Sequence, residues 1–92
     1  MNIQEKRNKV LLGKEKFQEA HQNYQKHVDT SSVYLMSTGL CVPILHDDGT
    51  KGYLDPINRL VVWSDGLMED AQSWFHLAEW IYNHEKHLRS EK

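Results

Sequence analysis

The sequence predicts a single α+β domain. It combines a long N-terminal helix, a small antiparallel meander of three or four strands, and a C-terminal amphipathic helix packed on the sheet. Three observations predict this class: a polar, proline-free stretch opens the chain, short apolar runs separated by turn residues fill its middle, and apolar residues at helical spacing return over its last third. A length of 92 residues, 39% of them hydrophobic and 26% charged, suits one small globular domain.

The first helix is expected over residues 3–28, a stretch that contains no proline. Four apolar side chains recur seven positions apart and form a narrow stripe on an otherwise polar helix. They are Ile3, Val10, Phe17 and Tyr24. A helix this polar must lean on the C-terminal helix or on another chain, and the narrow stripe predicts a homodimer through this helix. Gly13 costs about 1 kcal/mol relative to alanine within a helix, which leaves a break near that residue as the alternative.

Strands are expected after a run of small polar residues over 29–32, where the first helix should end. β-branched and large apolar residues predict strands over residues 33–38, 40–46, 51–55 and 58–63. The loop Asp47-Asp48-Gly49-Thr50 predicts a hairpin, because glycine readily adopts a positive φ. Pro43 has no N–H to donate, so its strand is expected at a sheet edge or at a bulge.

The second predicted hairpin carries a resemblance to a known kind of repeat. The stretch GYLDPINRLVV, residues 52–62, is similar to one unit of the WG-type bacterial repeats, in which a Gly-Tyr-Ile-Asp strand is followed by a turn and a Val-Val strand. The chain carries a single copy of this stretch. The resemblance implies a shared hairpin, and no function is carried over from it.

The C-terminal helix is expected over residues 65–89. Ser64 or Asp65 can cap its start, and Glu69 and Asp70 fall in its first turns, where the helix dipole favours carboxylates. At ~100° per residue, seven apolar residues form an arc of about 120° that should pack on the sheet. They are Leu67, Ala71, Trp74, Leu77, Ala78, Ile81 and Leu88, with Phe75 and Tyr82 at the margin. The same spacing fits an interrupted heptad, so a helical partner is the alternative.

A second stripe of this helix carries His76, Trp80, His84 and His87, within about 80° beside the apolar arc. Trp80 lies outside that arc, and a partly exposed tryptophan beside polar groups is typical of an interface hot spot. The histidines add a surface that can respond to pH. The alternatives are a merely solvated flank, a Trp80 that covers the edge of the sheet, and a metal site that uses His84 and His87.

Catalysis finds little support in the sequence. Cys41 is the only cysteine, so no internal disulfide and no cysteine-rich zinc site can form, and its apolar strand predicts a buried, inert thiol. Four aspartates in predicted loops match the ordinary use of this residue in turns and caps. They are Asp47, Asp48, Asp55 and Asp65. Because a glycine-rich phosphate loop is also missing, we expect no enzyme, no cofactor and no metal site.

Charge divides the chain into unlike parts, although the net charge is only −2. Residues 1–27 carry six basic and three acidic side chains, whereas residues 28–80 carry two basic and eight acidic ones. An acidic middle favours a partner with a basic surface. The N-terminal cations offer a nucleic-acid interface as the less favoured alternative, because glutamates are interspersed among them. These cations are Lys6, Arg7, Lys9, Lys14, Lys16 and Lys26.

These features predict a small, non-enzymatic regulator or inhibitor, of the kind that phages and mobile elements encode, which blocks a partner protein by surface docking. The expected contact residues are Trp80, His76, His84, His87, Asp47, Asp48 and Asp55. No run of 18 apolar residues occurs, and the N-terminus lacks the apolar core of a signal peptide, so no membrane contact is expected. The lone cysteine suits a reducing compartment, and we expect a cytoplasmic protein.

Overall fold

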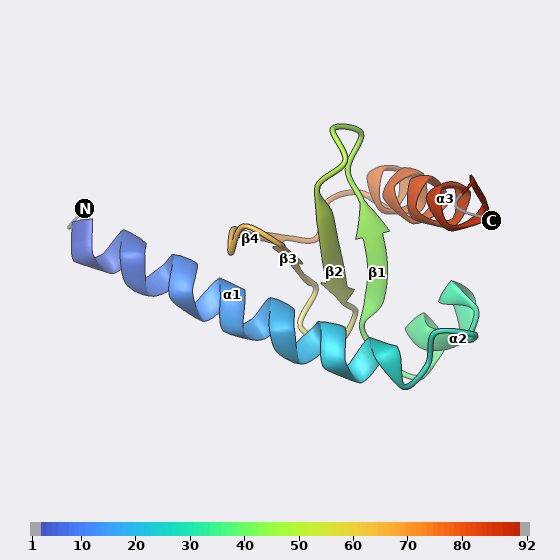
Figure 1. The fold of residues 1–92 in the computed structure, drawn as a ribbon, viewed down its shortest axis with the longest axis horizontal. Helices are drawn as coiled ribbons and strands as arrows, with labels where there is room; N and C mark the ends of the chain where they lie inside the picture. Colours follow the sequence, from blue (N-terminus) through green and yellow to red (C-terminus); the bar gives the residue numbers. More distant parts are fainter. Residues whose placement is uncertain (1–2, 91–92) are drawn as a thin grey trace.

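The computed structural model describes residues 3–90 and has the predicted α+β fold. Its elements, in chain order, are α1 (Ile3–Gln25), α2 (Ser32–Ser37), β1 (Val42–Leu45), β2 (Lys51–Asp55), β3 (Leu60–Trp63), β4 (Met68–Asp70) and α3 (Trp74–Ser90). In Figure 1 the helix α1 crosses the lower part of the view and its N-terminal half reaches beyond the sheet, whereas α3 lies at the upper right beside β1.

The sheet is the predicted antiparallel meander, in the order β1-β2-β3-β4. Leu45 pairs with Lys51 at the end of the first hairpin, and the backbone N–H of His46 donates to the carbonyl of Thr50 at 2.9 Å. Gly49 in this turn has a φ of 93°, the left-handed region that favours glycine. Pro43 lies in β1, which is an edge strand as its missing N–H predicted.

Alternate residues of the sheet point toward two separate helical layers. On one face, α2 and α3 cover a core that contains Leu35, Val42, Ile44, Leu54, Val61, Trp63, Leu77 and Trp80. On the other face, α1 covers Tyr53 and Val62 with Ala20 and Phe17. Because both faces are covered, β1 is buried at all four positions, and most positions of β2 and β3 are buried as well.

The segment predicted as a strand over residues 33–38 is instead the helix α2. Ser31 has extended backbone angles, and its hydroxyl accepts a hydrogen bond from the N–H of Tyr34 at 3.2 Å, so it caps this helix. At the other end, Gly39 has a φ of 78°, and the N–H of Leu40 donates to the carbonyl of Leu35 at 2.9 Å, as in a Schellman motif. The helix α1 ends at Gln25, before this polar run and before the predicted end at residue 28, and the run instead starts a second helix.

The C-terminal helix begins at Trp74, so the prediction of a helix from residue 65 is wrong. Residues 64–67 form a turn in which Gly66 has a φ of 92°, and Met68 then pairs with Val62 in the ladder between β3 and β4. Asp65 stabilises that turn, because its carboxylate accepts a hydrogen bond from the N–H of Leu67 at 3.0 Å. The residues expected in the first helical turns, Glu69 and Asp70, belong to a fourth strand.

The helix α1 continues without a break through Gly13 and packs against the sheet and the turn between β3 and β4. A methyl group at Gly13 would overlap the carbonyl oxygen of Gly66, so the glycine lets the helix approach the backbone of that turn. Phe17 and Tyr24 of the apolar stripe contact Tyr53. The part of the stripe formed by Phe17 and Tyr24 is thus occupied by the sheet, while the side chain of Ile3 lies outside the described part, and the predicted homodimer through this helix gains no support.

The contact between Gly13 and Gly66 can be tested with Gly13→Ala. Alanine has the better helix propensity by about 1 kcal/mol. The overlap with the turn should nevertheless lower the free energy of unfolding by about 1–3 kcal/mol, as overpacking generally does. Equilibrium urea unfolding measures the change, with Gln18→Ala at an exposed position of the same helix as the control. An increase in stability for Gly13→Ala would contradict the close approach of α1 to the turn.

Candidate functional site

The exposed surface of α3 carries three aromatic side chains that the sequence placed in or beside the core. Trp74 is 65% exposed, Phe75 is 77% exposed and Tyr82 is 58% exposed, and Ala78 between them is exposed as well. At ~100° per residue these four side chains lie within an arc of about 100°. We call Trp74, Phe75, Ala78 and Tyr82 the aromatic face of α3. Contiguous exposed apolar side chains of this kind mark interaction sites on small proteins.

The sheet-facing side of α3 is the stripe that sequence reasoning assigned to a partner. Trp80 is only 7% exposed and Leu77 is 3% exposed, and both belong to the core. Trp80 packs edge-on against Trp63, with ring centroids 5.1 Å apart and an interplanar angle of 85°. The expectation of a partly exposed Trp80 is therefore wrong. Trp80 instead covers the sheet, which was the alternative position considered for this residue.

Two apolar faces on one helix explain why periodicity selected the wrong side. The predicted core arc drew support from Leu67 and Ala71, but both residues precede α3 in the structure. Without them, the arc retains Trp74, Ala78 and Leu88, which are exposed, and Leu77 and Ile81, which contact the core. Aromatic pairs gain about 0.5–1.5 kcal/mol beyond their buried area. The contact between Trp80 and the sheet therefore favours this rotation of the helix.

The three histidines of α3 have different surroundings and do not form one exposed surface. His76 is exposed, and its ring stacks on Trp80 at a centroid distance of 6.4 Å. His84 is half-buried and meets the ring of Tyr24 edge-on at 6.4 Å. His87 is half-buried and borders a hollow beside the β1–β2 turn. His76 and His84 thus contact aromatic rings, and of the three histidines only His76 is widely exposed.

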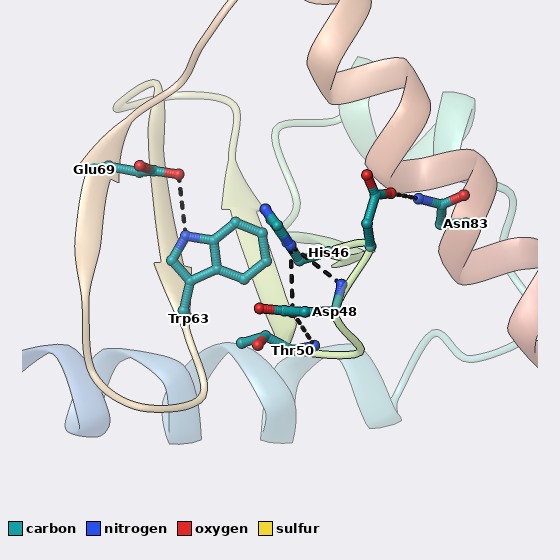
Figure 2. Close-up of polar contacts among 7 residues, drawn as sticks. His46, Asp48, Thr50, Trp63, Glu69 and Asn83 are labelled. Carbon is teal, nitrogen blue, oxygen red and sulfur yellow. Dashed lines mark hydrogen bonds and ion pairs between the residues drawn. The ribbon is translucent and has the colours of Figure 1, made fainter.

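Sequence reasoning missed His46, which joins the sheet to α3 at the end of β1. Its ring lies 5.7 Å from that of Trp63 and 6.1 Å from that of Trp80, and its Nδ1 atom lies 3.3 Å from a carboxylate oxygen of Asp48 (Figure 2). The alternation of side chains along a strand could have identified His46, because this residue follows Val42 and Ile44 at a spacing of two and so points to the same face.

The β1–β2 turn brings Asp47 to α3, whereas Asp48 bonds within the turn and Asp55 lies elsewhere. The amide of Asn83 donates to the carboxylate of Asp47 at 2.7 Å (Figure 2). Asp47 and Asn83 border the same hollow as His87, which has a volume of about 290 Å³. Asp55 ends β2 at the opposite end of that strand, so the predicted contact residues do not form one surface.

The aspartates in turns mainly satisfy backbone N–H groups of their own turns. Asp48 accepts a hydrogen bond from the N–H of Thr50 at 2.9 Å, and Asp55 accepts one from the N–H of Ile57 at 3.0 Å. Hydrogen bonds from Thr50, together with nearby His46, hold the pKa of Asp48 below its ordinary value. This is the structural use of aspartate in turns that the sequence suggested for these positions.

A cavity of about 240 Å³ lies between α1 and the sheet, and Cys41 is part of its wall together with Ala20 and Tyr53. Burial raises the pKa of the Cys41 thiol, and the negative charges of Asp55 and Glu19 raise it further. A thiol in this environment stays protonated at neutral pH and is a poor nucleophile. The inert thiol expected from the sequence is consistent with this site, although Cys41 precedes β1 and is only half-buried.

The cations of α1 whose side chains are described do not gather on one side of the helix. At ~100° per residue, Lys9 and Lys16 lie on one flank of the line that packs on the sheet, and Lys14 lies on the other. Glu15 and Glu19 are on the solvent side between them. The side chains of Lys6 and Arg7 lie outside the described part of the structure. A phosphate backbone needs clustered cations, so this arrangement gives the nucleic-acid alternative no support.

Metal binding and membrane insertion also find no structural support in the part of the chain that is described. Among the side chains that the structure describes, those of residues 9–90, no three from His, Cys, Asp and Glu come together as ligands for a metal ion. The alternative metal site at His84 and His87 therefore gains no further ligands from those residues. None of the described helices is both long and apolar enough to cross a lipid bilayer.

The orientation of α3 predicts that two aromatic substitutions change the stability by very different amounts. Trp80→Ala removes a buried indole and should lower the free energy of unfolding by about 3–5 kcal/mol. Phe75→Ala removes an exposed ring and should change it by less than about 0.5 kcal/mol. Equilibrium denaturation at low protein concentration measures both changes. If Phe75→Ala were the more damaging substitution, the helix would have to be rotated from the position described.

Tyr53 predicts a specific loss of stability at high pH. Burial, with smaller contributions from Tyr24 and Cys41, raises the pKa of Tyr53 to about 12, and its hydroxyl lies 2.7 Å from Nδ1 of His21. In the unfolded chain the hydroxyl of this tyrosine ionises near pH 10. The contribution of Tyr53 to the stability is therefore full below pH 10 and is lost as the pH rises toward 12. Tyr53→Phe should lack this component in unfolding titrations, and an unchanged slope there would contradict the assignment.

Comparisons with known proteins add no functional information. No protein-family model, no curated protein and no solved structure matches the chain. The likeness of residues 52–62 to a WG-type unit corresponds to the β2–β3 hairpin and extends no further. Support for a function of the aromatic face of α3 therefore comes from its own residues and from the elements that hold it.

Proposed function

We propose that this chain is a small, non-enzymatic regulator or inhibitor that acts by binding another protein through the aromatic face of α3. The observation that carries the proposal is the exposure of Trp74, Phe75 and Tyr82 on one side of a helix whose other side is anchored in the core. Tryptophan and tyrosine are enriched among the residues that dominate binding energy at protein interfaces. A helix fixed by its opposite side presents them with little loss of conformational freedom on binding.

The charges around the aromatic face favour a partner with a basic surface. Asp70 precedes the helix, and Glu79 lies at the margin of the face beside Phe75. Cationic groups on a partner that meets the N-terminal half of α3 would complement these carboxylates, and such complementarity mainly raises the rate of association. Docking there would block the partner surface sterically, as the small inhibitors of phages and mobile elements do.

Two further observations support a binding role over an enzymatic one. The Cys41 thiol has a raised pKa, which disfavours the thiolate that nucleophilic catalysis needs. The cavity beside it holds about 240 Å³, less than the roughly 300–1,000 Å³ of a typical small-molecule site. A single cysteine also suits the reducing cytoplasm, where we place both this protein and its partner.

The proposal is tested by capturing partners from cells that normally make the protein. The immobilised wild type should retain a partner that the double variant Trp74→Ala, Phe75→Ala releases almost completely. The double variant Leu11→Ala, Leu12→Ala is the matched control, because it truncates two adjacent exposed apolar side chains on α1. Both variants should unfold within about 1 kcal/mol of the wild type. Capture that survives in the α3 variant would contradict the proposal.

A further inference from the structure

His46 lies where the β1–β2 turn meets α3, and its ring contacts two tryptophans of the core. The centroid of this ring is 5.7 Å from that of Trp63 and 6.1 Å from that of Trp80. The side chain of His46 is 44% exposed, so the imidazole can exchange protons with solvent. The next residue also joins the turn to α3, because the carboxylate of Asp47 accepts a hydrogen bond from Asn83 at 2.7 Å. A change at His46 therefore acts where the turn holds the last helix.

The Nδ1 atom of His46 has two partners on Asp48, and they require opposite roles of it. The backbone nitrogen of Asp48 lies 3.3 Å from Nδ1, and its N–H can donate only while Nδ1 is unprotonated. The carboxylate oxygen Oδ1 of Asp48 also lies 3.3 Å from Nδ1, and it can accept only when Nδ1 carries a proton. Figure 2 shows both contacts. A neutral ring thus satisfies the amide but leaves two acceptor atoms, Nδ1 and Oδ1, facing each other.

Protonation of the ring reverses these roles. Imidazole is the side chain that gains a proton between about pH 8 and pH 5. Both ring nitrogens of the imidazolium donate, so Nδ1 then bonds to Oδ1 of Asp48 and no longer accepts the amide proton. The same Oδ1 atom already accepts from the N–H of Thr50 at 2.9 Å, so one oxygen then holds both ends of the turn. Hydrogen bonds from Thr50, together with nearby His46, lower the pKa of Asp48, which keeps its carboxylate ionised over this range.

The charged groups nearest to His46 favour a positive ring. Among the described residues, the carboxylate of Asp48 is the one group in ion-pair contact with the imidazole. Asp47 is adjacent in the turn, and Glu69 of β4 accepts the indole N–H of Trp63. Both indoles lie near the ~6 Å reach of a cation–π contact. The basic and titratable groups on the elements around the turn are Lys51 of β2 and His76, Lys86 and His87 of α3.

We infer that His46 and Asp48 form a pH-sensitive switch that adjusts how the β1–β2 turn holds α3. At higher pH, the neutral ring accepts the amide proton of Asp48. At lower pH, the protonated ring donates to the Asp48 carboxylate and places its positive charge against the indoles of Trp63 and Trp80, which strengthens the contact between the turn and the helix. The switch lies on the buried side of α3 and does not depend on whether the aromatic face binds a partner.

NMR spectroscopy of the full chain at low ionic strength tests the switch, because salt screens exposed charges. At about pH 8, the ring nitrogens of His46 should show the tautomer that carries its proton on Nε2. On titration to about pH 5, the amide proton of Asp48 should move upfield, because it loses its acceptor, with the same midpoint as the His46 ring. The indole N–H of Trp63 should shift at that midpoint too. These changes should be absent in His46→Gln.

Three further variants separate the switch from ordinary titration. Asp48→Asn keeps a side chain of the same shape but removes its negative charge, so the midpoint should move to lower pH. Asp47→Asn is the matched control, because this carboxylate bonds to Asn83 and not to His46, and it should move the midpoint much less. His76→Gln removes the ring that stacks on Trp80, and the titration of the Trp63 signal should persist in it.

Three results would overturn the inference. They are a proton on Nδ1 of His46 at about pH 8, an Asp48 amide that stays fixed while the ring titrates, and a midpoint that Asp48→Asn leaves in place or that Asp47→Asn moves as far. The tautomer is measured on the wild type, so that outcome does not depend on the folding of any variant. Far-ultraviolet circular dichroism verifies that the variants keep the helical content of the wild type.

Discussion

The packing of Trp80 against Trp63 is the interaction on which the rest of the structure depends. Their rings meet edge-on at 5.1 Å, and the ring of His46 contacts both of them. This cluster joins the last helix to the sheet and fixes which side of α3 is buried. Since the helix has two apolar sides, burying one of them leaves the other in solvent, and the aromatic face around Trp74 is the consequence.

The sheet is arranged so that it can hold the Trp63 indole. Gly52 pairs with Trp63 across β2 and β3, and a Cβ atom at Gly52 would overlap the ring. The indole N–H donates to the carboxylate of Glu69 at 3.1 Å, so the fourth strand satisfies its one polar atom (Figure 2). The turn that leads into this strand contains Gly66, against which Gly13 of α1 packs. Contacts on both faces of the sheet thus support the same small core.

The sequence correctly predicted those parts of the fold for which the local residues allow only one structure. The meander followed from turn residues and short apolar runs, and the edge position of Pro43 followed from its missing N–H. Prediction failed where two structures fit the same residues. Ser31 can end one helix or start the next, and the turn at Gly66 converts an apparent first helical turn into a strand. The orientation of α3 depends on contacts with Trp63, which is distant in sequence, and helical periodicity contains no such information.

The central claim is that α3 buries Trp80 and exposes Trp74, and quenching of tryptophan fluorescence by acrylamide tests it most directly. The chain has three tryptophans, of which Trp63 and Trp80 are buried. The wild type should show a readily quenched component that Trp74→Phe removes. Strong quenching that persists in Trp74→Phe would show that Trp63 or Trp80 is accessible to solvent, and it would contradict the orientation of the helix.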